Sequence, residues 1–396
     1  MNILIYINNL KGTGGPRVML NLARGFVNRG HKVTIIVDDL NSMAYDIPNQ
    51  IEVLKIENGR ILKLNSKNEG FTEKKTGIKN KLRKNKILTK VYGYLRRKIL
   101  DVNNYIKFDK KEFESNIKQL SPNVIINNNV INKHYYHDVF ESVCPSIICL
   151  HSAPKYLFNS RGVSLRKAEK LFKNRHCVAV SKESATELKD MFPSVKSSSS
   201  IYNIISKESI LDEANIILNR EVPKKYIIYV GTICERKRVD RIVMSLTHLD
   251  ESVSLVICGE GPLKDQIKTL VESLHLESRV YFFGFIRSPF YLIKNAECLV
   301  LSSDSEGLPT VLIESLMLNT PVVSTDCKTG PKEIMTGSMR QFLVDMQNEK
   351  EIPRIIAEKI VAASSLTGLD YNNFYAPFTQ KVVVSDWLDK FKEIGV

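Results

Sequence analysis

The chain has 396 residues, of which 43% are hydrophobic and 25% are charged, an ordinary composition for a globular protein. Its length exceeds what one hydrophobic core usually serves, so we expect two domains. No uncharged apolar run reaches the roughly 18–20 residues that cross a bilayer. Residues 1–10 read as a strand, since they lack the basic start and the cleavage site of a signal peptide. The seven scattered cysteines form no C-x-x-C pair, which argues against a disulfide framework or zinc site and favours a reducing cytoplasm.

The formal net charge is +14, and all of the excess lies in the first half of the chain. Residues 1–200 carry +18 and residues 201–396 carry −4. The segment 74–98 holds eleven basic residues and no acidic one, with apolar residues between them. These residues could form a basic amphipathic helix, which suits an anionic membrane surface. The alternative is that they form the solvated basic face of an ordinary helix. No nucleic-acid motif accompanies the segment, so we expect no nucleic-acid partner.

The predicted elements alternate between short apolar strands and helices from the N-terminus onward. In the first half we predict strands over residues 2–7, 32–37, 123–128, 146–151 and 176–181, and helices over 14–30 and 181–191. After a polar stretch over residues 206–225, we predict strands over 226–231, 254–259, 280–285, 297–303 and 321–327, and a closing helix over 379–395. This rhythm predicts an α/β protein with parallel sheets. We place the domains at residues 1–205 and 206–378, followed by a closing C-terminal helix over 379–396.

Parallel sheets bind ligands at the carboxyl ends of their strands, so the loops that follow strands are the candidate sites. The first strand is followed by KGTGGPR, in which Gly14 and Gly15 precede a helix. This loop could let a backbone approach an anion, or it could be a tight turn. Arg236 and Lys237 lie in the loop after the strand at 226–231. They could face a diphosphate, or they could belong to a solvated basic turn.

The stretch SSDSEGLPTVLIESL, residues 302–316, runs from a strand through an acidic turn into an apolar helix. Proline suits the first turn of a helix, and the free N–H groups of Thr310 and Val311 would suit an anion. Glu306, just before the helix, could cap it or bind a ligand. Glu314 lies inside the apolar helix, where an unpaired carboxylate is costly, so we expect it to face a cleft or a hydroxyl-bearing partner.

The stretch LSSDSEGLPTVLIESLMLNTPVVSTDCKTGPKEI closely resembles the nucleotide-sugar-binding region of retaining GT-B glycosyltransferases of family four. These enzymes carry two glutamates eight positions apart in the pattern E-G-x-P-x-x-x-x-E. The segments CLHSAP, VGTICERKRVD, ICGEGPLKDQI and VYFFGFI follow the family's order along the chain. The resemblance implies an α/β GT-B fold, in which two facing Rossmann-like domains enclose a cleft.

The resemblance also implies roles for the acidic and basic residues. Glu306 resembles the glutamate that contacts the donor sugar on the reactive face, and Glu314 the one that holds the ribose hydroxyls. Lys237 matches the lysine that binds the diphosphate. The family often has an arginine directly after the glycine of this loop, and Thr232 stands there instead. Arg236 or Arg238 could replace that arginine.

Other positions match the family's donor site more locally. His151 matches a histidine that approaches the donor sugar, and with Glu306 it forms the implied catalytic pair. Ile286 follows a strand where the backbone commonly reads the base. The remaining donor-binding positions that the resemblance implies are Gly14, Gly15, Gly307, Leu308, Thr310 and Val311.

The implied function is retaining transfer of a hexose or N-acetylhexosamine from a nucleotide-sugar, UDP-linked, to a lipid-linked or cell-surface glycan during polysaccharide synthesis, such as O-antigen or capsule synthesis. No metal or other cofactor is expected. The enzyme would be cytoplasmic and peripheral on the inner face of the membrane, held through residues 74–98. The alternatives are another GT-B enzyme, such as a nucleotide-sugar epimerase or a phosphorylase, and a non-catalytic glycan-binding module.

Overall fold

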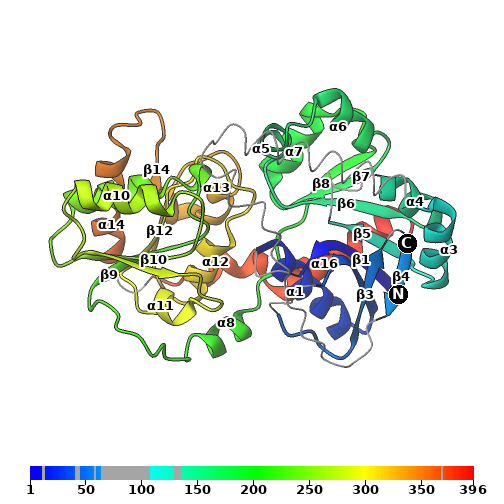
Figure 1. Ribbon diagram of the computed structural model, residues 1–396, viewed down its shortest axis with the longest axis horizontal. Helices are drawn as coiled ribbons and strands as arrows, with labels where there is room; N and C mark the ends of the chain where they lie inside the picture. Colours follow the sequence, from blue (N-terminus) through cyan, green and yellow to red (C-terminus); the bar gives the residue numbers. More distant parts are fainter. Residues whose placement is uncertain (11–13, 41–44, 58, 64–107, 129–134, 367–368) are drawn as a thin grey trace, which may run out of the picture. The chain divides into compact units, whose positions relative to one another are not determined.

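The structure is a computed structural model that describes all residues except 11–13, 41–44, 58, 64–107, 129–134 and 367–368. The basic segment 74–98 therefore lies outside the described residues. The described chain divides into two compact units, residues 1–149 with 391–396 and residues 150–390. Figure 1 shows the ribbon, coloured along the sequence.

The first sheet has the strand order β4-β3-β2-β1-β5-β6-β7-β8. Its strands are β1 (Asn2–Asn9), β2 (Lys32–Asp39), β3 (Ile51–Glu57), β4 (Arg60–Lys63), β5 (Val124–Asn127), β6 (Ser146–Leu150), β7 (His176–Ala179) and β8 (Ser197–Ser200). The edge strand β4 is antiparallel to β3, whereas β1 is parallel to both of its neighbours. Helices on both faces bury such strands, which explains their continuous apolar runs.

The second sheet has the order β11-β10-β9-β12-β13-β14. Its strands are β9 (Tyr226–Val230), β10 (Ser254–Cys258), β11 (Val280–Gly284), β12 (Cys298–Leu301), β13 (Val322–Thr325) and β14 (Leu343–Val344). All of its strand pairs are parallel. The order of the strands reverses between β9 and β12, and doubly wound sheets bind ligands at the carboxyl ends beside such a reversal.

Helices connect the strands of both sheets. The α-helices are α1 (Gly14–Asn28), α3 (Lys110–Gln119), α4 (Tyr135–Val143), α5 (Pro154–Arg161), α6 (Leu165–Phe172), α7 (Lys182–Met191), α8 (Lys207–Glu213), α9 (Val239–Ser245), α10 (Lys264–Ser273), α11 (Phe290–Lys294), α12 (Thr310–Met317), α13 (Pro331–Ile334), α14 (Ile352–Ser364), α15 (Asn372–Tyr375) and α16 (Gln380–Glu393). Short 3₁₀ turns are η1 (Glu235–Lys237), η2 (Leu246–His248), η3 (Gly337–Phe342) and η4 (Ala376–Phe378).

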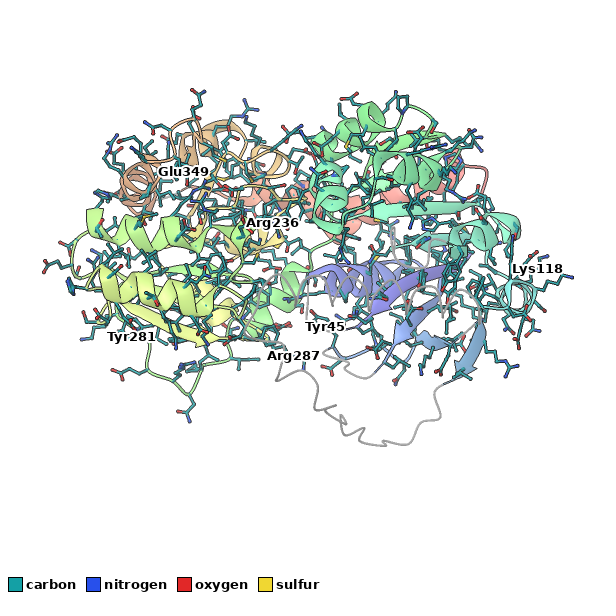
Figure 2. All side chains as sticks on the ribbon, turned by 45° about the horizontal axis from the view of Figure 1, so that its top comes forward. Tyr45, Lys118, Arg236, Tyr281, Arg287 and Glu349 are labelled. Carbon is teal, nitrogen blue, oxygen red and sulfur yellow. The ribbon has the colours of Figure 1, made fainter. Side chains whose placement is uncertain are left out.

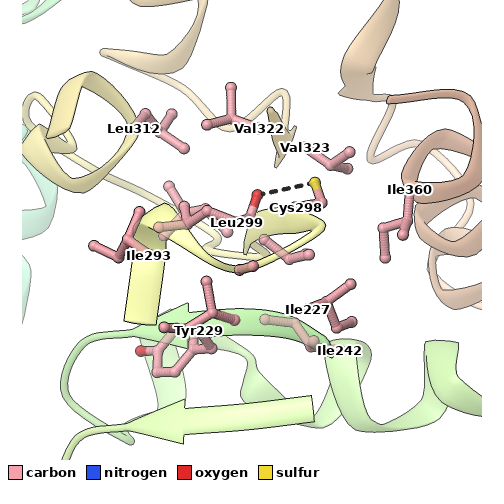
Figure 3. Packing of buried hydrophobic residues seen from close by; sticks show 14 of the residues in the cluster. Ile227, Tyr229, Ile242, Ile293, Cys298, Leu299, Leu312, Val322, Val323 and Ile360 are labelled. Atoms are coloured by element: carbon pink, nitrogen blue, oxygen red, sulfur yellow. Dashed lines mark hydrogen bonds between the residues drawn. The ribbon is translucent and has the colours of Figure 1, made fainter. Parts of the chain in front are cut away.

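The core of the second sheet forms around its central strands. Ile227 of β9 and Leu299 of β12 are fully buried, and Figure 3 shows them among side chains from the helices above and below the sheet. Ile242 comes from α9 and Leu312 from α12, and both are fully buried as well. This packing fixes the two strands whose carboxyl ends carry the candidate site.

The predicted elements all overlap observed ones, but four strands among the described residues were not predicted. These are β3, β4, β8 and β14. The strand β8 consists of four serines, which carry no apolar alternation, and β14 has only two residues. Each of these two edge strands pairs with a single neighbour, and that pairing rather than its own pattern makes the segment a strand. The predicted domain boundary at 205/206 lies between β8 and β9 and stays a prediction, as do the other domain limits.

We predict that Gly259→Ala destabilises the second sheet. An added Cβ would lie 1.8 Å from the carbonyl oxygen of Gly231, a backbone atom that cannot swing away. Overpacking of this kind costs about 1–3 kcal/mol or more. Gly15→Ala is the control, because a Cβ there meets nothing within 4 Å and alanine favours a helix. Urea unfolding should show a loss for Gly259→Ala and none for Gly15→Ala. Equal free energies of unfolding would contradict the close approach.

Candidate functional site

Two loops at the carboxyl ends of β9 and β12 are fastened to each other. The amide of Asp304 donates to the carbonyl of Arg236 at 2.9 Å. The hydroxyl of Ser302 donates to the carbonyls of Lys237 and Arg238 at 3.0 and 2.6 Å. The basic loop is therefore held against the acidic turn by backbone acceptors, at the reversal point of the sheet.

Glu306 lies at the centre of this junction. Its carboxylate oxygens lie 2.6 Å from Nζ of Lys237 and 2.9 Å from Nη1 of Arg236. The hydroxyl of Ser303 donates to the same carboxylate at 2.5 Å. Only 8% of the Glu306 side chain is exposed. Burial alone would raise the pKa of this carboxyl, but Lys237 and Arg236 outweigh burial and hold the pKa below its ordinary value. Glu306 is therefore an ionised carboxylate.

The two arginines that could replace the one missing at Thr232 lie in different surroundings. Arg236, labelled in Figure 2, also donates to the carbonyl of Ser305. Arg238 adopts a left-handed conformation with φ of 45° and pairs with Asp240 at 2.9 Å and with Glu349. Of these two arginines, Arg236 is thus the one that shares a carboxylate with Lys237.

The network around Arg238 extends into the protein interior. Arg241 is 2% exposed and pairs with Asp304 at 2.8 Å and with Glu349 at 2.5 Å. Its guanidinium also donates to the carbonyl of Ser302 at 2.9 Å. A buried guanidinium held by two carboxylates is a structural element. Sequence reasoning missed it because Asp304 and Glu349 are far apart in the chain.

Gly307 packs against the backbone that follows β6. An added Cβ would lie 2.4 Å from the carbonyl oxygen of His151. Gly330, with φ of +91°, closes the other side, where a Cβ would lie 2.7 Å from Cδ of Pro309 and 2.8 Å from the carbonyl oxygen of Gly307. The hydroxyl of Thr329 donates to the carbonyl of Glu306. The glycines at these two motif positions leave room for three backbone segments to converge around Glu306.

His151 is half-buried, and its Nδ1 lies 3.2 Å from Oδ1 of Asn203. Burial lowers the pKa of the imidazole to about 4, although the hydrogen bond to Asn203 opposes the shift. The side chain is therefore neutral near pH 7, so it could serve as a hydrogen-bonding group but not as a standing positive charge.

The helix α12 begins at Thr310, and Pro309 is its N-cap rather than a residue of its first turn, where the sequence predicted it. Thr310 and Val311 are half-exposed in its first turn, whereas Leu308 is buried before it. Glu314 is buried among the apolar residues of α12, with 9% exposure. The expectation that it faces a cleft or a hydroxyl-bearing partner stays a prediction.

Three other residues that were predicted to bind the nucleotide-sugar donor lie outside the junction around Glu306. Ile286 follows β11 and packs, partly buried, against the core of the second sheet. Gly14 and Gly15 begin α1 in the other compact unit, and added Cβ atoms there would meet nothing within 4 Å. Their predicted roles beneath a diphosphate and beside a base stay predictions.

A second polar junction, missed from the sequence, joins the segment after β13 to the start of α7. The carboxylate of Glu333 accepts from the amides of Lys182 and Glu183 at 2.9 and 3.0 Å and from the hydroxyl of Tyr202 at 2.9 Å. In return, Glu183 accepts from the amide of Thr329 at 2.8 Å. The available signal was Glu333 in GPKEI, the end of the stretch that resembles the glycosyltransferase family, because a carboxylate suits a helix N-terminus.

No cluster of three or more His, Cys, Asp or Glu side chains suited to a metal ion occurs among the described residues. Within the same part of the chain, every helix is too short or too polar to span a bilayer. None of the seven cysteines, all of which lie in the described residues, forms a disulfide.

Comparisons with known proteins match this region. Residues 212–362 match the family model described as glycosyl transferases group 1. The chain is 36% identical over 137 residues to an uncharacterised glycosyltransferase of Methanocaldococcus jannaschii, covering 32% of this chain and 34% of that protein. It is 31% identical over 215 residues to the N-acetylgalactosamine-N,N'-diacetylbacillosaminyl-diphospho-undecaprenol 4-alpha-N-acetylgalactosaminyltransferase of Campylobacter jejuni, covering 54% of this chain and 57% of that protein. The chain thus spans between a third and three fifths of these two relatives.

A solved structure resembles the whole chain. The crystal structure of HepE from Anabaena in complex with UDP superimposes with a TM-score of 0.68 at 15% identity, covering 99% of this chain and 100% of that one. This likeness confirms the GT-B fold that the sequence resemblance implied. The family model covers the second sheet and its helices, the region that carries Glu306.

We predict that His151 makes stability depend on pH. Its pKa is lowered from 6.5 to about 4 in the folded state, so the unfolded chain takes up a proton first as the pH falls. The stabilising contribution is therefore complete above pH 6.5 and is lost between pH 6.5 and 4, by up to about 3 kcal/mol. Urea unfolding at pH 7, 5.5 and 4 should show this loss, and His151→Gln should flatten it. An equally steep loss in the variant would assign the dependence to other groups.

Proposed function

We propose that the protein is a retaining glycosyltransferase of family four. In this proposal it moves a hexose or N-acetylhexosamine from a UDP-sugar to a lipid-linked or cell-surface glycan acceptor in polysaccharide synthesis. The observation that carries the proposal is the junction of Glu306 with Lys237 and Arg236 at the reversal point of the second sheet. Two cations in the loop that follows β9, beside the carboxyl end of β12, suit a diphosphate. The matched family model and the relatives, all glycosyltransferases by name, support the reaction class.

In the proposed mechanism, Lys237, Arg236 and the first amides of α12 stabilise the diphosphate as it leaves. Glu306 binds the sugar hydroxyls and Glu314 the ribose. His151, neutral at working pH, contributes a hydrogen bond rather than a charge. The acceptor hydroxyl attacks the anomeric carbon on the face that the diphosphate leaves, and its proton passes to a diphosphate oxygen. The anomeric configuration is thereby retained, and no metal or other cofactor takes part.

The surroundings of Glu306 favour a binding role over a nucleophilic one. Both carboxylate oxygens are already engaged, one by Arg236 and the other by Lys237 and Ser303. A carboxylate that shares its charge with two cations is a weak nucleophile. The two carboxylates of a retaining glycosidase instead stand apart on either side of the bond that breaks. These contacts support transfer to an acceptor rather than hydrolysis through a glycosyl-enzyme.

The proposed acceptor lies at a membrane. The Campylobacter relative is named for a diphospho-undecaprenol substrate, and the first half of this chain carries the whole positive excess. We therefore propose that the enzyme is cytoplasmic and binds the anionic inner face of the membrane peripherally, with the segment 74–98 as one contact.

Removal of Lys237 tests the leaving-group role. Lys237→Ala should lower kcat/KM by about 10²–10³-fold, as the loss of other preorganised charge partners does. Lys350→Ala, which removes an exposed lysine of the same unit, should leave kcat/KM within about twofold. Release of UDP from a panel of UDP-sugars measures both. Wild-type turnover in Lys237→Ala would remove this residue from the mechanism.

Removal of Glu306 tests whether the two cations form the diphosphate site. Glu306→Ala leaves Arg236 and Lys237 partly buried without their carboxylate, which should cost about 3–5 kcal/mol of stability. UDP supplies the missing negative charge, so it should raise the melting temperature of Glu306→Ala by more than that of the wild type. Transfer should be lost in this variant. A variant that UDP does not stabilise would place the diphosphate elsewhere.

A further inference from the structure

The helices α5 and α6 form a hairpin whose outer face is basic. Between residues 154 and 173 the only acidic residue is Glu169, which is half-buried and accepts a hydrogen bond from Ser194. The exposed basic residues of the hairpin are Lys155, Arg161, Arg166, Lys167, Lys170 and Lys173. Within the described part of the chain none of these six forms an ion pair. Their charges therefore remain available to a partner, and Figure 1 shows α6 at the outer margin of the part that contains β7 and β8.

The charges of α6 are arranged in a stripe. Arg166 and Lys170 are four positions apart and share one face of the helix, and Lys173, the C-cap of α6, follows three positions later. The opposite face, with Ala168, Leu171 and Phe172, is buried.

An apolar side chain lies at the tip of the hairpin. Leu165, the first residue of α6, is 60% exposed and stands directly before Arg166 and Lys167. Arg161 stands across a three-residue turn from it. Contact between an exposed leucine and water is unfavourable. The interface of an anionic bilayer would bury the leucine and place the basic residues beside it next to anionic headgroups.

The hairpin is preformed. Gly162 ends α5 in the left-handed conformation, with its amide 3.2 Å from the carbonyl of Asn159. The ring of Phe158 in α5 contacts that of Phe172 in α6, with 5.7 Å between centroids, and Phe192 after α7 completes the cluster at 5.4 and 5.1 Å. The outer face thus needs little reorganisation to bind a flat surface.

We propose that the outer face of the α5–α6 hairpin binds the anionic headgroups of a lipid bilayer, with Leu165 inserted at the interface. Lipid is favoured over a soluble polyanion because the exposed leucine at the tip would gain nothing from a polyanion. The inference deepens the proposed function by naming a described surface that would bring the enzyme to a lipid-linked acceptor. The vesicle binding itself is measured without donor or acceptor, so its failure is distinguishable from failure of the transferase proposal.

The first experiment measures sedimentation of the full chain with vesicles of phosphatidylcholine containing about 30% phosphatidylglycerol, at about 0.1 M salt. The combined variant Arg166→Gln, Lys167→Gln, Lys170→Gln and Lys173→Gln should lower the partition coefficient roughly tenfold or more. It should keep the thermal stabilisation that a UDP-sugar gives the wild type. Binding equal to that of the wild type would overturn the proposal.

The matched control removes the same charge elsewhere. Lys224, Lys225, Lys350 and Lys381 are exposed residues of the same compact unit. Their combined change to Gln should leave the partition coefficient within about twofold. An equal loss in this control would show that net charge alone drives binding, and that would also overturn the proposal.

The second experiment reports insertion at the tip. Leu165→Trp should shift its fluorescence to the blue and be quenched by brominated anionic lipid, against the constant background of the buried Trp387. Val361→Trp is the control, because Val361 on α14 is 58% exposed, nearly the same as Leu165, and should do neither. If the fluorescence of Leu165→Trp neither shifted to the blue nor was quenched, the proposal would be overturned. An equal blue shift with soluble polyphosphate would also overturn it, because it would make the hairpin a site for polyanions.

Discussion

The ion pair of Glu306 with Lys237 and Arg236 is the interaction on which the rest of the candidate site depends. Two cations held next to each other repel, and both are mostly buried here, with side-chain exposures of 13% and 23%. The carboxylate removes that repulsion before any ligand arrives. The lowered pKa of Glu306 follows from the same contacts, because the neighbouring cations favour its charged form more than burial disfavours it.

That ion pair forms only because the backbone brings its partners together. Arg236 and Lys237 follow β9, whereas Glu306 follows β12, and the two strands are neighbours only because the sheet reverses its order there. Gly307 then lets the acidic turn approach the carbonyl of His151, where any side chain would collide with backbone. Charge and steric fit are coupled, since a Cβ at position 307 would push the carboxylate away from its cations.

The sequence predicted the fold and the grouping of these residues better than their contacts. Alternating apolar strands and helices were enough for the α/β class and for the central strands of both sheets, and the resemblance carried by E-G-x-P-x-x-x-x-E implied the GT-B fold that the solved structure confirms. Local patterns could not give β8, because its four serines become a strand through pairing with β7. The pairing of Arg238 and Arg241 with Glu349 depends on a separation of more than a hundred residues, which no spacing rule anticipates. The roles of Gly14, Gly15 and Ile286 depend on a ligand and stay predictions.

In the proposed function, the ion pair of Glu306 also prepares Lys237 and Arg236 to bind the diphosphate of the donor. A diphosphate carries more negative charge than a single carboxylate and has more oxygens to share, so an arriving donor competes successfully for Lys237 and Arg236. Glu306 would then share the two cations with the diphosphate, and its remaining lone pairs would accept hydrogen bonds from the sugar hydroxyls. In the proposed mechanism the cations need no rearrangement, because the carboxylate already holds them side by side, and preorganised charge of this kind is what stabilises a leaving group most effectively. On this argument the carboxylate holds the two cations in place before the donor arrives and shares them with the diphosphate afterwards.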